Sequence, residues 1–252
     1  MKLRGLVKWL GLCALTVVIG ACSSTGPRTG FAESDDFEPM SRAFLDGNRR
    51  LDFYVLRPAA EGYDLVTPAL FQHMIGNGLS HLELPGDFAN YLLQGEFTKS
   101  AETFGRLTLN TLMGAGGLLD PAKEFGLARQ STDFGITLGG YGVGEGSYLV
   151  LPFIGPTTMR DTAGFLVDRA FSPSTYIGQF TALDAFGPAV TGLGLLDTRN
   201  RNAAFIDEVL YEADDSYVTL RAAYLQRRRS LIAGEESTDT VPDIFDDEAE
   251  SN

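Results

Sequence analysis

Cysteine, histidine and tryptophan are all scarce in this chain of 252 residues, which contains two, two and one of them respectively. Cys13 lies inside the apolar N-terminal segment, so the processed chain would keep a single cysteine and could form no internal disulfide. The fold must therefore be held by its core. No stretch reaches the roughly 20 uninterrupted apolar residues that a spanning helix requires, which excludes a protein with several membrane spans.

Positive charge is also in short supply. The 20 Lys and Arg residues are outnumbered by 33 Asp and Glu residues, for a net charge of −13. A chain of this charge repels phosphate backbones, which argues against general binding to nucleic acids. Hydrophobic residues nevertheless make up 44% of the sequence, so the chain can bury a core and is not wholly disordered.

The common catalytic motifs are missing as well. There is no G-x-S-x-G elbow, no H-E-x-x-H and no Walker motif, and the glycine run at 139–146 has the wrong spacing for a dinucleotide fingerprint. His73 and His81 lie roughly on one face of a predicted helix. A metal site there would also need Glu83 or Asp87, and a lipid hydrolase would have to use one of the two histidines. We favour neither, and we expect no enzyme activity.

The N-terminus carries the most specific signal. Three basic residues among the first eight precede an uncharged, mostly apolar segment over residues 9–21, a pattern typical of a secretory signal. The segment ends in Ile19-Gly20-Ala21-Cys22, which resembles the lipobox of bacterial lipoproteins. This motif predicts that residues 1–21 are removed and that Cys22 carries a diacylglycerol and an N-acyl chain. Ser23, rather than Asp, follows the cysteine and points to the outer membrane.

The mature chain divides into three predicted segments. Residues 22–34 are small and polar and form an acylated tether, and residues 35–233 form one helical domain. Residues 234–252 contain eight acidic residues and no basic one, so we expect a disordered tail.

Capping patterns mark several helix starts in the domain. Thr158 with Asp161 fits a capping box, in which the first side chain accepts a hydrogen bond from the backbone of the second. A capping residue followed by proline marks further starts at residues 67–68, 120–121 and 172–173.

The spacing of apolar residues adds to this pattern. It predicts helices around residues 71–82 and 97–112 and a last helical stretch over 203–232, broken near Asp214. The best strand candidate is residues 148–153, although Pro152 weakens it.

Glycine is concentrated between Gly76 and Gly146, where 15 of the 29 glycines occur. Because each glycine inside a helix costs about 1 kcal/mol, the concentration indicates either close helix packing of the kind used in lipid or backbone that must turn tightly. We expect a tight, functional loop or channel segment at Gly139, Gly140, Tyr141, Gly142, Val143 and Gly144.

Arginines are scattered through the acidic domain. Their forked donors suit phosphate, so some could hold lipid headgroups at a membrane surface. Ion pairs with nearby acids explain each of them at least as well. Our candidates for headgroup contacts are Arg57, Arg106 and Arg160.

A series of short motifs follows the lipobox in order. They are Asp36-Phe37-Glu38, Arg57-Pro58, NYLLQG at 90–95, RLTLNT at 106–111, Tyr141-Gly142-Val143-Gly144, LPF at 151–153, DSY at 215–217 and YLQR at 224–227. Together they resemble the MlaA (VacJ) family of outer-membrane lipoproteins over about residues 35–234. The chain departs from the family in the early helix, where Ser41-Arg42 stands in place of an Asn-Arg pair.

The resemblance implies a fold and a function. It implies a mainly α-helical, ring-shaped (donut) domain lying in the periplasmic leaflet of the outer membrane, with an amphipathic channel and Gly-rich irregular loops. It implies that phospholipid is extracted from the outer leaflet and delivered to a soluble carrier, MlaC, in association with trimeric porins and without a cofactor. A structural lipoprotein that tethers porins without moving lipid remains an alternative, as does a lipid hydrolase.

Overall fold

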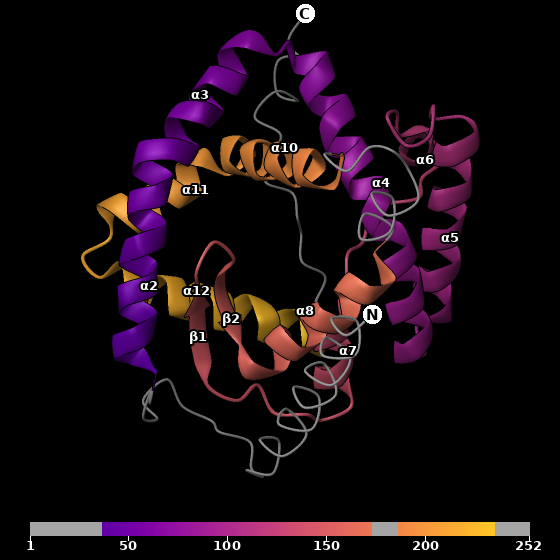
Figure 1. Ribbon diagram of the computed structural model, residues 1–252. Coiled ribbons are helices and arrows are strands. Elements are labelled where there is room, and N and C mark those ends of the chain that lie inside the picture. The colour runs from indigo at the N-terminus through magenta and orange to yellow at the C-terminus, as the bar shows by residue number, and fades with distance from the viewer. Residues whose placement is uncertain (1–36, 173–185, 235–252) are drawn as a thin grey trace, which may run out of the picture.

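The computed structural model describes residues 37–172 and 186–234, most of which are helical (Figure 1). The mainly α fold predicted from the sequence is thereby confirmed. The predicted signal peptide, Cys22, the tether and the acidic tail beyond Gly234 lie outside the described residues, and so does Pro173 of one predicted helix start.

Helices α2 (Glu38–Leu51) and α3 (Arg57–Val66) are joined by a π-helical turn, η1 (Asp52–Leu56), into one continuous segment. Pro39 occupies the first turn of α2, where its missing N–H is not needed. The backbone stays helical across both junctions, so η1 is a widened turn and not a break. The segment ends at Thr67, whose extended backbone is the conformation favoured before proline.

Helices α4 (Ala69–Gln94) and α5 (Phe97–Leu112) pack against each other. The start predicted at residues 67–68 is one residue early, because Pro68 is the N-cap and α4 begins at the next residue. Gly95 ends α4 with φ of 77°, a left-handed conformation that glycine adopts without strain. The connection to α5 is so short that the two helices run antiparallel.

Two short helices follow, α6 (Pro121–Glu124) and α7 (Phe134–Gly140). Asp120 is the N-cap of α6, as predicted, but its carboxylate does not bond the helix N-terminus and binds other side chains instead. Asp133 caps α7 by accepting a hydrogen bond from the backbone N–H of Ile136.

The predicted strand is confirmed as one arm of an antiparallel hairpin, β1 (Tyr148–Leu151) and β2 (Gly155–Thr158). Pro152 lies in the turn, where it removes no ladder hydrogen bond. The hairpin leads directly into α8.

Helix α8 (Met159–Phe171) begins with the predicted cap, because Thr158 Oγ1 accepts a hydrogen bond from the Asp161 N–H at 3.2 Å. The chain then re-enters the described region at α10 (Phe186–Arg201).

The last helical stretch was predicted with a break near residue 214, and the structure confirms it. Helix α11 (Ala203–Asp207) and the π-helical turn η2 (Glu208–Glu212) precede the break, and α12 (Ser216–Ala233) follows it. Asp215 caps α12 and also binds Arg42 of α2 through two hydrogen bonds of 2.9 and 3.0 Å, which joins the two ends of the domain.

Figure 1 shows α2 and α3 on one side of the molecule and α4 and α5 on the other, with α10 crossing between them. Helix α10 contacts both α3 and α4. The hairpin, α7, α8 and α12 lie at the opposite end from α10. An apolar core forms where α2, β1 and α12 meet, and it consists of Leu45, Tyr148, Val150, Tyr217 and Leu225.

Candidate functional site

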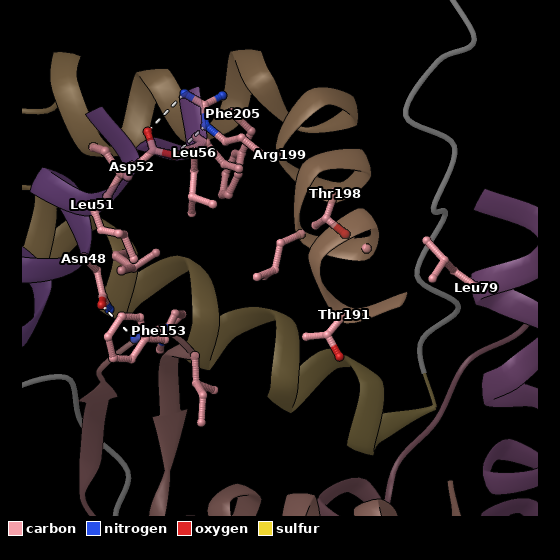
Figure 2. Close-up of a pocket in the computed structure, with 18 of the residues that line it drawn as sticks. Asn48, Leu51, Asp52, Leu56, Leu79, Phe153, Thr191, Thr198, Arg199 and Phe205 are labelled. Carbon is pink, nitrogen blue, oxygen red and sulfur yellow. Dashed lines mark hydrogen bonds and ion pairs between the residues drawn. The ribbon is translucent and has the colours of Figure 1, made fainter. Parts of the chain in front are cut away.

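A cavity of about 560 Å³ lies among the elements, with walls from α2, η1, α4, the hairpin, α8, α10, α11, η2 and α12 (Figure 2). Most of the lining side chains are apolar, and a few polar groups are set among them. A wall of this kind suits a ligand that has both an apolar and a polar part. The lining includes Leu51, Leu56, Leu79, Leu82, Val190, Leu195, Phe205 and Leu220 as apolar residues and Asn48, Asp52, Glu83, Arg169, Thr191, Thr198 and Arg199 as polar ones.

The most buried polar group of the wall is an ion pair between Asp52 in η1 and Arg199 in α10 (Figure 2). Arg199 Nε lies 2.7 Å from Asp52 Oδ1, and Arg199 Nη2 lies 2.6 Å from Asp207 Oδ1. Burial disfavours the charge on Arg199, but the hydrogen bonds to Asp52 and Asp207 outweigh burial and raise its pKa. The guanidinium therefore stays charged and binds both carboxylates.

Tyr211 of η2 completes this cluster by donating its hydroxyl to Asp52 Oδ2 at 2.8 Å. Burial, together with the bond to Asp52, raises the pKa of Tyr211 to about 12, so the phenol keeps its proton. The two π-helical turns of the described residues thus meet at one cluster beside the cavity. Such turns occur frequently at functional sites.

The hairpin tip forms another part of the wall. Asn48 of α2 donates its side-chain amide to the Leu151 carbonyl and accepts the backbone N–H of Phe153, both at 2.9 Å. Phe153 has φ of 65°, and its side chain is 76% exposed. Phe153 and Ile154 both line the cavity.

Two of the arginines predicted to contact headgroups are buried in ion pairs. Arg106 Nη2 lies 2.6 Å from Asp120 Oδ2. Arg160 Nε lies 3.0 Å from Asp161 Oδ1, and its Nη1 donates to the Val143 carbonyl. Neither side chain lines the cavity, so headgroup contact at these positions stays a prediction.

Arg57 lies closer to the cavity wall. Its guanidinium is partly exposed and pairs with Glu61 at 3.3 Å and with Asp207 at 3.4 Å. Asp207 is the same carboxylate that binds Arg199, so one acid separates Arg57 from the lining of the cavity.

The predicted tight loop begins in the last turn of α7 and runs towards β1. Gly142 has φ of 84°, as expected of backbone that must turn tightly, whereas Gly144 has open space around it and no such φ. A Cβ at Gly139 would lie 3.2 Å from Arg160 Nη1, and the same guanidinium binds Val143. The structure therefore brings the loop together with Arg160, away from the cavity lining.

Helix α5 turns its apolar face outward. Phe97, Phe104 and Leu112 are 70%, 54% and 79% exposed. This is the reverse of a helix that packs on a core in water. The buried face of α5 is polar and consists of Ser100, Thr103, Arg106 and Asn110.

Further exposed apolar side chains extend from η1 through the end of α3 to the start of α4. A surface of this kind usually marks contact with a membrane or another protein. The residues are Phe53, Tyr54, Val55, Leu65, Val66, Leu70 and Phe71. No helix in the described ranges is both long enough and apolar enough to cross a bilayer.

The two histidines lie away from the cavity lining. His73 is exposed, and His81 Nε2 lies 3.1 Å from Thr111 Oγ1. Burial lowers the pKa of His81, and its ring packs against Gly117, where a Cβ would clash. Within residues 37–172 and 186–234, no three potential metal ligands of the His, Cys, Asp and Glu types gather at one place.

Sequence reasoning missed Asn48, Asp52 and Phe153, which the structure places in the wall. Arg199 is one of the scattered arginines and was not among the candidates for headgroup contacts. A signal for Asp52 was available, because it is the single charged residue between Leu51 and Leu56 in an otherwise apolar run. Its partner is 147 residues away, and no local pattern identifies it.

The chain is similar to known proteins over most of its length. The family model for MlaA lipoproteins matches residues 33–231. The chain is 33% identical to the intermembrane phospholipid transport system lipoprotein MlaA of Escherichia coli (strain K12), over 94% of this chain and 91% of that protein. It is 32% identical to the protein of the same name from Haemophilus influenzae, over 92% and 94%.

A solved structure is similar as well. It is described as the structural basis for maintenance of bacterial outer membrane lipid asymmetry, and it matches with a TM-score of 0.68 and 35% sequence identity. The match covers 80% of this chain and 100% of that chain.

Proposed function

Because this chain belongs to the MlaA lipoprotein family, we propose that it removes mislocalised phospholipids from the outer leaflet of the outer membrane and passes them to a soluble periplasmic carrier. The process breaks no covalent bond and maintains lipid asymmetry. The amphipathic cavity is the feature of this chain that carries the proposal.

The cavity supports lipid passage because its lining matches the two parts of a phospholipid. Aliphatic side chains such as Leu79 and Leu195 offer a surface for acyl chains. The Asp52–Arg199 pair and the hydroxyl of Thr198 offer polar partners for a headgroup. Since moving a charged headgroup through hydrocarbon is costly, a passage with polar groups in its wall lowers that barrier.

We place the domain as a ring within the periplasmic leaflet. The cavity is lined by residues from α2, α4, α8, α10 and α12, and the outward apolar face of α5 would contact acyl chains. Helices that are too short or too polar to span a bilayer can lie in one leaflet with their apolar faces in the hydrocarbon.

The proposal extends to the anchor and the partners. Acylated Cys22 would hold the chain at the outer membrane, because several acyl chains give stable anchoring where a single one does not. Family membership supports association with trimeric porins and delivery to a carrier of the MlaC type.

The test measures phospholipid exposed in the outer leaflet, labelled on intact cells that lack this gene and carry one variant each. We expect wild type to lower the exposed phospholipid and Cys22→Ala to fail. Gly194→Trp should also fail, because Gly194 lines the cavity and a Cβ there would already contact Leu79 Cδ2 at 3.6 Å, so that the indole would obstruct the lining. Gly192→Trp is the matched control on the same helix, since Gly192 is exposed and does not line the cavity.

Two results would overturn the proposal. If deletion leaves the exposed phospholipid unchanged while porin assembly is disturbed, the chain is a structural tether. If Gly194→Trp accumulates at the membrane and functions as well as Gly192→Trp, lipid does not pass through the cavity.

A further inference from the structure

A second concave site lies on the other face of the α2–η1 segment. It is a cleft of about 380 Å³ that shares no lining residue with the cavity. Five of its six residues lie along one helical face of α2 and η1, and the sixth comes from η2. The lining residues are Asp46, Arg49, Arg50, Phe53, Tyr54 and Tyr211.

The cleft contains an excess of positive charge in an otherwise acidic chain. Two guanidinium groups line it against one carboxylate, that of Asp46. Arg49 stacks over the ring of Tyr211, with 5.5 Å between the guanidinium carbon and the ring centroid. Within the described ranges, neither Arg49 nor Arg50 forms an ion pair or donates a side-chain hydrogen bond, so their forked donors are available to a ligand.

Helix capping does not account for these two arginines. Cations near a helix C-terminus are favoured because free carbonyl groups lie there. Here the helix continues, and the N–H of Asp52 bonds the carbonyl groups of Asn48 and Arg49. The positive charge therefore has no free helix end to compensate.

Exposed aromatic side chains stand beside the arginines. Phe53 and Tyr54 are 52% and 73% exposed and meet edge to face, with 5.1 Å between their ring centroids. Val55, the next residue, is 52% exposed. Aromatic rings next to basic groups are typical of sites at the boundary between headgroups and hydrocarbon.

We propose that this cleft binds the phosphate group of an anionic membrane lipid that is retained and not transported. Arg49 and Arg50 donate to the phosphate oxygens, and Phe53, Tyr54 and Val55 lie among the acyl chains. The bound lipid fixes the depth and orientation of the α2–η1 segment in the leaflet. The inference rests on the membrane placement of the proposed function but does not require lipid passage.

The experiment titrates full-length acylated protein in an uncharged detergent with three probes by calorimetry. The probes are dihexanoyl phosphatidylglycerol, dihexanoyl phosphatidylcholine and inorganic phosphate. All titrations use the Gly194→Trp background, which is designed to obstruct the cavity. We expect saturable phosphatidylglycerol binding that is weaker at high salt, because screening reduces the attraction between the phosphate and the guanidinium groups.

Charge variants locate the site. Arg49→Gln with Arg50→Gln should weaken phosphatidylglycerol binding about tenfold or more, as the loss of a charge-assisted hydrogen bond predicts. Lys99→Gln with Lys123→Gln removes the same charge on other helices and should leave the affinity unchanged. Arg50→Gln alone keeps the Arg49–Tyr211 stacking intact and should show a smaller loss if the double variant misfolds.

Each outcome decides the proposal. Preference for phosphatidylglycerol over both other probes supports a lipid ligand. Equal affinity for inorganic phosphate supports the phosphate chemistry and assigns free phosphate as the source. Undiminished binding in the arginine variants, or equal loss in the lysine control, overturns the proposal. A failure of Gly194→Trp to block lipid removal in cells would overturn the proposed function, but the comparison of arginine and lysine variants would stand, because both carry the same cavity.

Discussion

The end of the molecule that contains the hairpin and the side that contains α4 and α5 differ in which side chains they bury. Where α2, β1 and α12 meet, Leu45, Val150 and Leu225 are buried as in a protein folded in water. In α5 the buried face contains Arg106 and other polar residues, while the apolar side chains face outward.

The difference shows that two structural units of one chain bury different kinds of side chain. The first unit gains stability by removing apolar side chains from water. The second keeps Arg106 and Asn110 bonded to Asp120 inside, which is the arrangement expected where no water is available outside. The placement of the domain at a membrane, proposed above, would satisfy both units.

The largest expected effect is a change of stability with pH that arises from one buried carboxyl group of α4. Asp87 of α4 is buried, and its Oδ2 has no partner, so burial raises its pKa to about 7. The folded state then holds a proton that the unfolded chain releases near pH 4, and stability falls as the pH rises from about 4 to about 7, by up to about 4 kcal/mol. Asp87→Asn should remove this loss. Unfolding in detergent at pH 5 and pH 8 measures it.

Asp161, at the other end, should behave in the opposite sense. Burial disfavours its charge, but Arg228, Tyr224 and Arg160 outweigh burial and lower its pKa. Its contribution to the free energy of unfolding is present above about pH 4 and is lost as the pH falls further.

The Asp87 prediction has its own control. Glu124→Gln, on an exposed residue, is the control for Asp87→Asn. An unchanged pH profile in Asp87→Asn would contradict the prediction.

A second test removes the buried ion pair on the inner face of α5. Arg106→Met should destabilise the domain by about 3 kcal/mol, because it leaves the Asp120 carboxylate without its cation. Arg129→Met is the matched control, since the Arg129–Glu83 pair is exposed and contributes at most about 1 kcal/mol. Denaturant unfolding in detergent compares the two variants. Equal effects would mean that the buried pair does not hold α5 in place.

A third test compares a buried leucine near the hairpin with an exposed leucine of α5. Leu225→Ala should lower the free energy of unfolding by about 2 to 3 kcal/mol, because Leu225 is buried in the core. Leu112→Ala should leave it nearly unchanged, because Leu112 is 79% exposed. The two variants should rank the other way in vesicle binding, measured in a chain that also carries Cys22→Ala so that no acyl anchor is present. There Leu112→Ala should bind vesicles more weakly than Leu225→Ala. A vesicle affinity unaffected by Leu112→Ala would show that this face does not contact lipid.

The smallest effect concerns the loop between the two regions. Gly142→Ala should cost about 1 kcal/mol, because a Cβ is strained at φ of 84°. Gly144→Ala, two residues away in open space, should be neutral. Thermal unfolding of the two variants side by side measures the difference, and identical midpoints would contradict the assignment of backbone strain to Gly142.

Local signals predicted several elements and starts, although the helix predicted around residues 71–82 extends over 69–94. The cap at Thr158, the break before Asp215 and the strand, predicted over residues 148–153 and observed over 148–151, all follow from side chains that act on their own neighbours. The spacing of Phe97, Phe104 and Leu112 likewise predicted a helix, since periodicity depends only on the helical repeat.

The cavity could not be predicted in the same way. Periodicity gives the apolar stripe of α5, which is not part of the cavity, but it does not say that the stripe faces outward, because that depends on the surrounding medium.

In the cavity wall, the pairing of Asp52 with Arg199 joins distant segments, and it depends on how α10 crosses the molecule. The widened turn that points Asp52 inward has no sequence signature that we recognised.

The left-handed backbone of Phe153 has a consequence for how this chain could be engineered. Glycine would adopt φ of 65° without strain, whereas phenylalanine costs about 1 to 2 kcal/mol there, and a ring that is 76% exposed recovers little by burial. A variant chosen for thermal stability alone would therefore replace this ring by glycine and empty part of the cavity wall. Stabilising consensus or library screens on this protein would select against a side chain that forms part of the cavity wall, so stability and function must be scored separately.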